Sequence, residues 1–292
     1  MSTLVLDGGL STHLERLGAD LSDELWSARL LLERPELVRQ AHADYFAAGA
    51  DVATTASYQA TFEGFARRGL DARQAEALLR LSVELAAQAR DEAGHGLVAA
   101  SVGPYGAFLA NGAEYTGDYD LDEEALYAWH RPRWEALAAA GADLLACETV
   151  PSYPEARALA RLLRDTPGAR AWISFSCRDG ERINDGTPIL AAAALFAGDP
   201  RVVAVGANCT APRHIPALIA RLSGGPAGGL PIVVYPNSGE SWDAGHRRWL
   251  GLADPVDFGR AAAEWRRAGA SMVGGCCRTT PEHIRQIRAH LG

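Results

Sequence analysis

Three cysteines carry the strongest chemical signal in this sequence. Cys276 and Cys277 are adjacent and follow two glycines, and Cys209 stands in the motif Gly-Ala-Asn-Cys-Thr. Three thiolates bind zinc and leave its fourth tetrahedral position open, as in catalytic zinc sites. An open position among sulfur ligands suits the binding of a further sulfur compound as its thiolate. We therefore predict a zinc site; the alternative is that these thiols only fill space as small apolar side chains.

The remaining cysteines and the histidines are weaker candidates. Glu148 is expected to face the interior of the fold, and alternation along a strand then turns its neighbour Cys147 outward as a packing residue. Cys177 ends another apolar run and could reach the site, but we do not assign it as a ligand. The eight histidines show no metal-binding spacing such as His-Glu-x-x-His, so we interpret them as surface or structural residues.

Asp7 and Glu148 form a second chemical group, because each follows an apolar run. Two carboxylates at one cavity would hold an α-ammonium group, and backbone N–H groups around Gly8 and Gly9 would bind the matching carboxylate at the start of a helix. The pattern predicts a site for an amino acid whose side chain projects toward the metal. The alternative for Asp7 is helix capping, since Gly-Gly and Ser11 follow it.

A segment rich in aromatic and acidic residues follows Gly103. Ring faces and carboxylates attract cations, and a loop of this length after a strand is often a lid. Two interpretations stay open: a lid that surrounds a cation, or an ordinary surface loop ordered by its aromatic side chains. The residues concerned are Tyr105, Phe108, Glu114, Tyr115, Asp118 and Tyr119.

Short apolar runs alternate with helical periodicity along the whole chain. Ala-Gly-Ala followed by Asp or Ser occurs three times and is typical of a helix that ends at glycine before a buried strand. Eight strands with helices between them predict an α/β fold, a single-domain (β/α)8 TIM barrel over residues 1–292. The alternative, an open doubly wound sheet, lacks its phosphate-binding glycine turn after a strand. The strands are expected at 3–7, 51–56, 97–102, 143–148, 171–177, 202–208, 231–236 and 271–275, and helices at Pro35–Ala48, Ala72–Ala93, Glu123–Ala140, Tyr153–Asp165 and Pro255–Ala268.

A closed barrel would let distant residues share one site, because the carboxyl ends of its strands meet at one face. Cys209 would follow the sixth strand and the Cys276–Cys277 pair the eighth, two strands apart. Adjacent cysteines in a regular strand point to opposite faces, so the backbone must turn there. We expect Gly274 and Gly275 to supply the conformational freedom for that turn.

Composition excludes several functional classes. The chain has 292 residues, 48% of them hydrophobic, and a net charge of −8, which is unlike a nucleic-acid-binding protein. It contains no lysine, which excludes Schiff-base catalysis and a P-loop. No apolar run approaches the roughly 20 residues of a membrane span. Five cysteines, two of them adjacent, indicate free thiols in a reducing, cytoplasmic compartment.

The chain resembles the zinc-dependent homocysteine S-methyltransferase family along nearly its whole length. The Asn-Cys and Gly-Gly-Cys-Cys motifs together are highly specific, whereas Ala-Gly-Ala-Asp alone would be weak. The family has a (β/α)8 barrel fold, so the resemblance implies a zinc-dependent enzyme of the EC 2.1.1 class that forms methionine. It rests on Asp7–Glu15, Ser101–Gly106, Glu148–Pro151, Gly206–Thr210, Tyr235–Glu240 and Val273–Pro281.

The resemblance also implies roles for single residues. Asp7 and Glu148 would lie near the homocysteine amino group, and backbone and hydroxyl groups near its carboxylate. Further residues match family positions that line the same pocket. The implied substrate-binding residues are Gly8, Thr54, Thr55, Tyr58, Asn208 and Asn237, and the implied zinc ligands are Cys209, Cys276 and Cys277.

The methyl donor is less closely specified. The Gly-Pro-Tyr-Gly loop and the short chain resemble members that use S-methylmethionine or S-adenosylmethionine, whereas betaine-using members carry additional C-terminal sequence. Other hypotheses stay open: betaine or another donor with a thiol or selenol acceptor, a non-catalytic homocysteine- or zinc-binding barrel, and zinc hydrolysis with Glu148 as base. We expect small-molecule partners, no nucleic acid or membrane, and a monomer or weak homo-oligomer.

Overall fold

The computed structural model describes residues 3–21, 27–225, 227–243, 248–250 and 254–292. All eight predicted strands are present, and their ends agree with the predicted ones to within two residues. A further short antiparallel pair, which no apolar run indicates, is formed by β8 (Ser241–Asp243) and β9 (Arg248–Leu250). The predicted strands are β1 (Leu4–Val5), β2 (Val52–Thr54), β3 (Leu97–Val102), β4 (Leu144–Val150), β5 (Ala171–Phe175), β6 (Val202–Asn208), β7 (Ile232–Tyr235) and β10 (Ala270–Val273).

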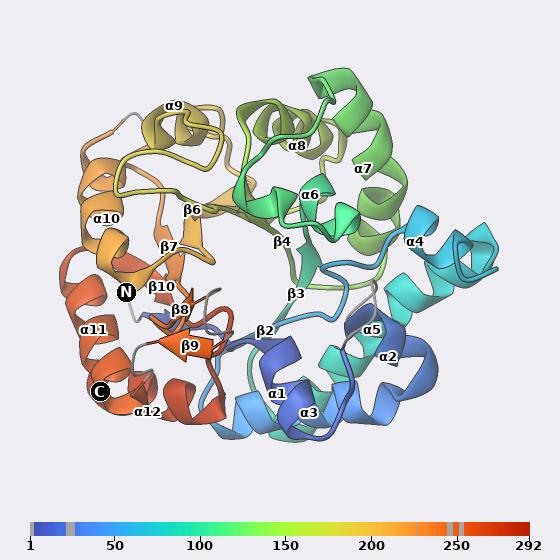
Figure 1. Cartoon of the computed structure of the whole chain (residues 1–292), viewed down its shortest axis with the longest axis horizontal. Helices are drawn as coiled ribbons and strands as arrows, with labels where there is room; N and C mark the ends of the chain where they lie inside the picture. Colours follow the sequence, from blue (N-terminus) through green and yellow to red (C-terminus); the bar gives the residue numbers. More distant parts are fainter. Residues whose placement is uncertain (1–2, 22–26, 226, 244–247, 251–253) are drawn as a thin grey trace.

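These eight strands form one parallel sheet that closes on itself (Figure 1). Its order is β1-β10-β7-β6-β5-β4-β3-β2, and a parallel bridge between Leu6 and Val52 joins the first strand to the last. Closure confirms the (β/α)8 barrel and excludes the open doubly wound sheet. It also confirms that β6 and β10 are two strands apart, with β7 between them.

The helices surround the ring of strands (Figure 1). The five predicted helices are present, and each Ala-Gly-Ala element ends a helix at a glycine of positive φ: Gly49, Gly141 and Gly269. The helices are α1 (Leu10–Arg16), α2 (Ser27–Glu33), α3 (Pro35–Ala47), α4 (Phe62–Ala66), α5 (Ala72–Ala93), α6 (Tyr105–Leu109), α7 (Glu123–Ala138), α8 (Tyr153–Asp165), α9 (Ile189–Ala194), α10 (Ile215–Gly224), α11 (Pro255–Arg267) and α12 (Pro281–Leu291), with 3₁₀ turns η1 (Ala113–Tyr115) and η2 (Pro212–His214).

Alternation along the strands separates two apolar layers. One layer fills the barrel and includes Ala146 and Trp172, whereas Cys147 belongs to the larger layer between strands and helices. Successive side chains in a strand point to opposite faces, so Glu148 faces inward again. This confirms Cys147 as a packing residue and places Glu148 on the side where a barrel site is built.

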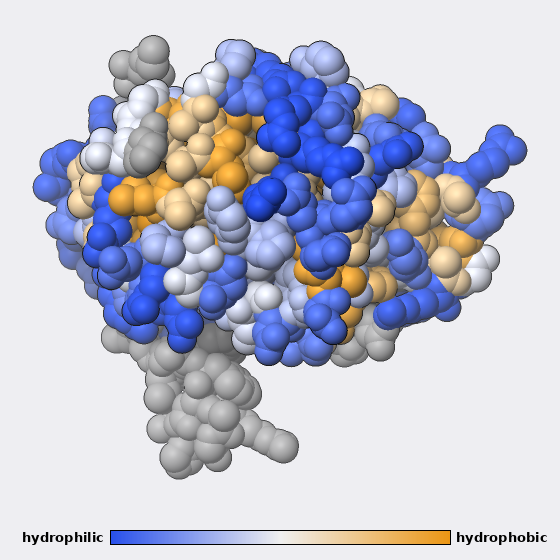
Figure 2. Space-filling view, turned by 90° about the horizontal axis from the view of Figure 1, so that it is seen from above, coloured by the Kyte–Doolittle hydropathy of each residue, from blue (hydrophilic) through white to orange (hydrophobic). Residues whose placement is uncertain are grey.

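One face of the molecule shows how polar and apolar residues are distributed on the surface (Figure 2). On the face shown in Figure 2, hydrophilic residues predominate and apolar ones form smaller areas between them. None of the described helices combines the length and apolar character needed to cross a membrane.

Gly206 marks a close approach between β6 and β7. A Cβ atom there would lie 1.7 Å from the carbonyl oxygen of Val233, so Gly206→Ala would force the two strands apart. We predict that the substitution lowers the free energy of unfolding by about 1–3 kcal/mol or more, measured by urea denaturation. Gly168→Ala is the control, because a Cβ there meets no atom within 4 Å and stability should change by less than about 1 kcal/mol. Equal losses in both variants would contradict the close approach.

Candidate metal centre and substrate pocket

The structure brings the three predicted cysteines together at the carboxyl ends of β6 and β10. Their Sγ atoms all lie within 4.8 Å of one another, and those of Cys209 and Cys277 are 3.4 Å apart. Tetrahedral coordination with metal–sulfur bonds of about 2.3 Å places sulfurs about 3.8 Å apart. The three thiols therefore fit a single metal ion that prefers sulfur ligands.

The reason why adjacent cysteines reach one point differs from our expectation. Gly274 and Gly275 do not adopt positive φ; their N–H groups continue the ladder, donating to the carbonyl oxygens of Val234 and Asp7. Glycine is required for space, because a Cβ on Gly274 would lie 2.6 Å from that of Leu6. The prediction that these glycines supply turn freedom was wrong.

The turn that separates the two cysteines comes after the glycines. Cys276 is still extended and donates its N–H to Pro236 O, and the next residues form a turn closed by Thr279 N–H to Cys276 O at 3.1 Å. Arg278 within this turn has φ 64°. Cys276 thus ends the extended backbone and Cys277 begins the turn, which lets both sulfurs face the same point.

Two further residues at this rim adopt left-handed backbone conformations that are costly for non-glycine residues. Cys209 has φ 48° and Thr149 has φ 61°. Asn208 holds the second of these: its Oδ1 accepts from Thr149 N–H at 2.7 Å and its Nδ2 donates to Thr149 Oγ1 at 2.8 Å. Backbone strain is therefore concentrated where the sulfurs and Glu148 are presented.

The cysteine cluster contacts Tyr115, and this contact was not predicted from the sequence. The Tyr115 hydroxyl lies 3.2 Å from Cys209 Sγ and 3.9 Å from Cys277 Sγ, while the residue as a whole is 44% exposed. Cys177, in contrast, lies outside the cluster, and its Sγ faces the Phe175 carbonyl oxygen at 3.7 Å. The described residues thus offer three thiols and no fourth one at this point.

Asp7 and Glu148 line the same cavity as the three cysteines. Asp7 Oδ2 accepts from Thr54 N–H at 2.7 Å, and Thr54 Oγ1 donates to both carboxylate oxygens. The Ser101 hydroxyl donates to Glu148. The capping alternative for Asp7 is wrong, because the N-cap of α1 is Gly9 and no side chain caps this helix.

Burial changes the ionisation of these carboxyls. It raises the pKa of Asp7 from 3.8 to about 8, against the opposing effect of the hydrogen bonds from Thr54. It raises the pKa of Glu148 from 4.5 to about 7, and the hydrogen bond from Ser101 opposes this shift. An α-ammonium group between the two would favour their charged forms.

The other predicted substrate-binding residues divide into two groups. Four line the cavity and two, Asn208 and Asn237, are not among the residues that line it. Thr54 Oγ1 already donates to Asp7, and Thr55 Oγ1 accepts from Ser101 N–H at 3.0 Å and bonds Ser57 at 2.7 Å. Neither hydroxyl is free for a substrate carboxylate. The four residues that line the cavity are Gly8, Thr54, Thr55 and Tyr58.

The aromatic segment after Gly103 does not form one cage. Glu114 and Tyr115 line the cavity, whereas Tyr105 and Phe108 pack against Trp129 of α7, with ring centroids 4.9 and 5.6 Å from it. Of the two open interpretations, the one in which all these rings surround a cation is therefore wrong. Only the η1 portion of the segment faces the site.

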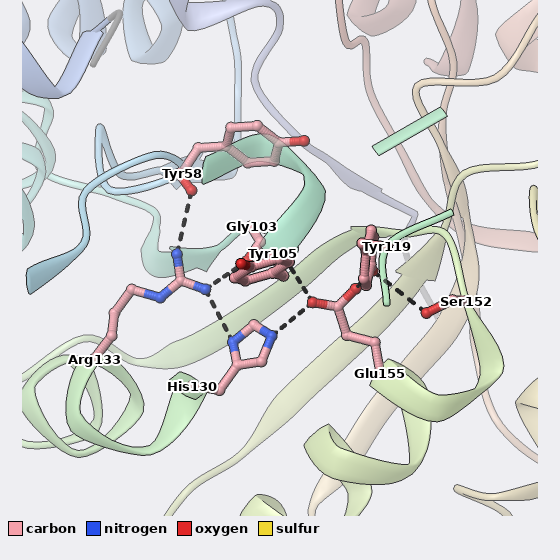
Figure 3. Close-up of polar contacts among 8 residues, drawn as sticks. All are labelled: Tyr58, Gly103, Tyr105, Tyr119, His130, Arg133, Ser152 and Glu155. Carbon is pink, nitrogen blue, oxygen red and sulfur yellow. Dashed lines mark hydrogen bonds and ion pairs between the residues drawn. The ribbon is translucent and has the colours of Figure 1, made fainter. Parts of the chain in front are cut away.

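Glu155 of α8 holds both ends of this segment (Figure 3). Its buried carboxylate accepts from Tyr105 N–H at 2.7 Å and from the Tyr119 hydroxyl. His130 Nε2 lies 2.7 Å from the same carboxylate. The stretch that carries Glu114 is thus fixed on either side by one buried side chain.

Arg133 completes this network and joins it to the turn that follows β2 (Figure 3). Its guanidinium donates to the carbonyl oxygens of Gly103 and Tyr58 and, at 3.0 Å, to His130 Nδ1. An Nδ1 that accepts from arginine makes His130 neutral, with Nε2–H donating to the carboxylate; burial lowers the pKa of His130 accordingly. This histidine is structural, as predicted.

Acidic groups dominate the cavity. Its described lining contains three carboxyls and three thiols, and neither arginine nor histidine is among those lining residues; the chain has no lysine. Burial also raises the pKa of the third carboxyl, Glu114. Such a cavity favours cationic ligands.

Comparison with known proteins is consistent along the whole chain. A model of the family described as homocysteine S-methyltransferase matches residues 4–291. The chain is 51% identical over 296 residues to homocysteine S-methyltransferase YbgG of Bacillus subtilis (98% of this chain, 93% of that protein) and 52% identical over 297 residues to homocysteine S-methyltransferase of Escherichia coli (98% and 94%). The solved metallated form of homocysteine methyltransferase MmuM from Escherichia coli aligns with a TM-score of 0.88 at 50% identity, over 99% of this chain and 96% of that one. These matches confirm the resemblance inferred from the motifs.

The cysteine cluster predicts a clear metal-binding result. Wild-type protein supplied with zinc and then dialysed should retain about one ion per chain, and Cys276→Ala should lose it because one of three thiols is gone. Cys177→Ala is the matched control and should retain the ion. The measurement is metal content by plasma emission spectroscopy. Full retention by Cys276→Ala, or loss in Cys177→Ala, would show that the ligand set is wrong.

The buried Asp7 carboxyl predicts a pH-dependent stability. Its pKa is about 8 in the folded protein and near 3.8 in the unfolded chain, so the folded state holds the proton over this range and loses stability as the pH rises through it. Asparagine does not ionise. The melting temperature of Asp7→Asn relative to wild type should therefore increase between about pH 4 and pH 8 in the absence of substrate. A difference that stays constant or decreases with pH would contradict this assignment.

Proposed function

The chain belongs to the homocysteine S-methyltransferase family, and we propose that it transfers a methyl group from a sulfonium donor to the thiol of L-homocysteine, forming methionine. We infer S-methylmethionine or S-adenosylmethionine as the donor and zinc as the metal. One observation carries the proposal: three convergent cysteine sulfurs and two buried carboxyls line a single cavity. Together these groups suit an amino acid that carries a thiol on its side chain.

Homocysteine would bind with its charged end at Asp7 and Glu148. The α-ammonium group would replace the protons that burial now favours on these carboxyls, and both would become ionised on binding. Gly8 would approach the substrate carboxylate with its backbone N–H, since the hydroxyls of Thr54 and Thr55 are already engaged. Thr54 would act by orienting Asp7.

Cys209, Cys276 and Cys277 would hold the zinc ion. When bound, zinc would supply the positive charge that keeps the substrate thiol ionised at neutral pH. Cys177 faces away from the cluster, which leaves the fourth position to a ligand. This argues against a closed zinc-storage site.

The methyl transfer is a displacement at carbon. The homocysteine thiol loses its proton, its sulfur forms a bond to the donor methyl carbon, and the carbon–sulfur bond of the sulfonium breaks with its electron pair left on the departing sulfur. With S-methylmethionine both products are methionine and one proton is released. The protein contributes mainly by holding the two substrates in line within a partly dry cavity, and Tyr115 closes part of its rim.

We also propose that residues 1–292 act as one homocysteine-binding domain, as a monomer or weak homo-oligomer. A reducing compartment such as the cytoplasm suits a site made of free thiols. Its partners would be the two small-molecule substrates.

A donor screen on zinc-loaded protein tests the proposed function. With homocysteine present, S-methylmethionine or S-adenosylmethionine should give methionine well above a no-donor control, measured by mass spectrometry. Betaine should give little, because the resemblance implies a sulfonium donor and betaine carries a quaternary ammonium group instead. Methionine formed without a sulfonium donor, or with betaine alone, would contradict the choice of donor.

A further inference from the structure

Glu114 is a buried acidic group of the cavity that has no role so far. It lies in η1, is 5% exposed and lines the cavity together with Cys277. Its Oε2 atom is buried and has no hydrogen-bond partner among the described residues. An unpartnered buried carboxylate oxygen costs free energy, so it points to a partner that a ligand supplies.

The position of Glu114 is fixed by its backbone. Its carbonyl oxygen accepts from Ser176 Oγ at 2.9 Å and from Asn184 Nδ2 at 3.4 Å. Helix α6 packs so closely on it that a Cβ on Gly106 would lie 2.4 Å from Glu114 N. With Glu155 holding both ends of the segment (Figure 3), the carboxylate has little freedom to leave the cavity.

The other acidic groups already have cationic partners in the proposed reaction. Asp7 and Glu148 would meet the homocysteine ammonium group, and the cysteines the metal. Glu114 lies outside the group of ligand atoms that surround the metal position, yet its neighbour Tyr115 places η1 beside the sulfurs, 3.2 Å from Cys209 Sγ. The remaining cation is the donor sulfonium, which must approach these sulfurs to react.

We propose that Glu114 recognises the positive charge of the sulfonium donor and thereby selects sulfonium compounds over neutral thioethers. This inference rests on the proposed function. The charge on the donor sulfur disappears during methyl transfer, so the attraction to Glu114 is strongest for the bound donor and weakest for the thioether product. Glu114 therefore favours donor binding and product release and does not accelerate the chemical step, because the attraction weakens as the charge is lost.

Glu114→Gln in the zinc-loaded enzyme tests this role. The KM for S-methylmethionine should rise about tenfold or more, and kcat should stay the same or rise, because the lost attraction is stronger in the ground state than in the transition state. The KM for homocysteine should stay within about twofold. Asp118→Asn is the matched control: it neutralises an exposed carboxylate of the same segment that does not line the cavity, and its kinetics should equal those of wild type. An unchanged donor KM in Glu114→Gln, or a loss confined to kcat, would overturn the proposal.

Inhibition by methionine distinguishes recognition of the sulfonium charge from recognition of the α-ammonium group. It has the same ammonium and carboxylate as S-methylmethionine but a neutral sulfur, and it must occupy the donor position as product. Its inhibition constant against the donor, at saturating homocysteine, should be unchanged in Glu114→Gln. Equal weakening of methionine and S-methylmethionine would assign Glu114 to the ammonium group and overturn the inference. Donor affinity is also measured by calorimetry. If the wild-type chain transfers no methyl group, the proposed function is rejected. The affinities of wild type and Glu114→Gln for S-methylmethionine and for methionine still show whether Glu114 selects the charged compound.

Discussion

Negative charge enclosed in one cavity is the constraint on which the rest of the site depends. Three thiols and three carboxyls share a lining in which the described residues include neither arginine nor histidine. Buried anions are stable only when protons or cations neutralise them, and the raised pKa values of Asp7 and Glu148 indicate that the ligand-free protein uses protons. In the proposed reaction three bound groups supply positive charge instead of protons: the metal ion, the substrate ammonium group and the donor sulfonium. Selection by charge thus follows from the lining itself.

The barrel assembles this lining from segments far apart in the chain. β7 separates the strands that precede the cysteines, and the left-handed residues Cys209, Thr149 and Arg278 turn the chain at the rim. These conformations are unfavourable by themselves. Local hydrogen bonds, such as those of Asn208 to Thr149, hold them in place. The stable barrel therefore supports a locally strained rim.

The fold can be predicted from the sequence more completely than the arrangement of the site residues. Apolar runs bounded by glycine predict the eight strands and the barrel, because burial on both faces of a parallel strand leaves a continuous apolar pattern. The convergence of Cys209, Cys276 and Cys277 follows from that order. The orientation of Tyr115 and the split of the aromatic segment do not follow, because they depend on which neighbours η1 and α7 meet in three dimensions. The role of Gly274 was also predicted wrongly, because a position that lacks space for a Cβ atom and a position that needs positive φ are both occupied by glycine.

The central claim is that three cysteine sulfurs bind one metal ion and leave a position for the sulfur of homocysteine. X-ray absorption at the zinc edge measures this directly on the zinc-loaded protein. The account predicts three sulfur ligands at about 2.3 Å in the absence of substrate and four when homocysteine is added. A sulfur count of four before homocysteine is added, or a count that does not change on its addition, would contradict it.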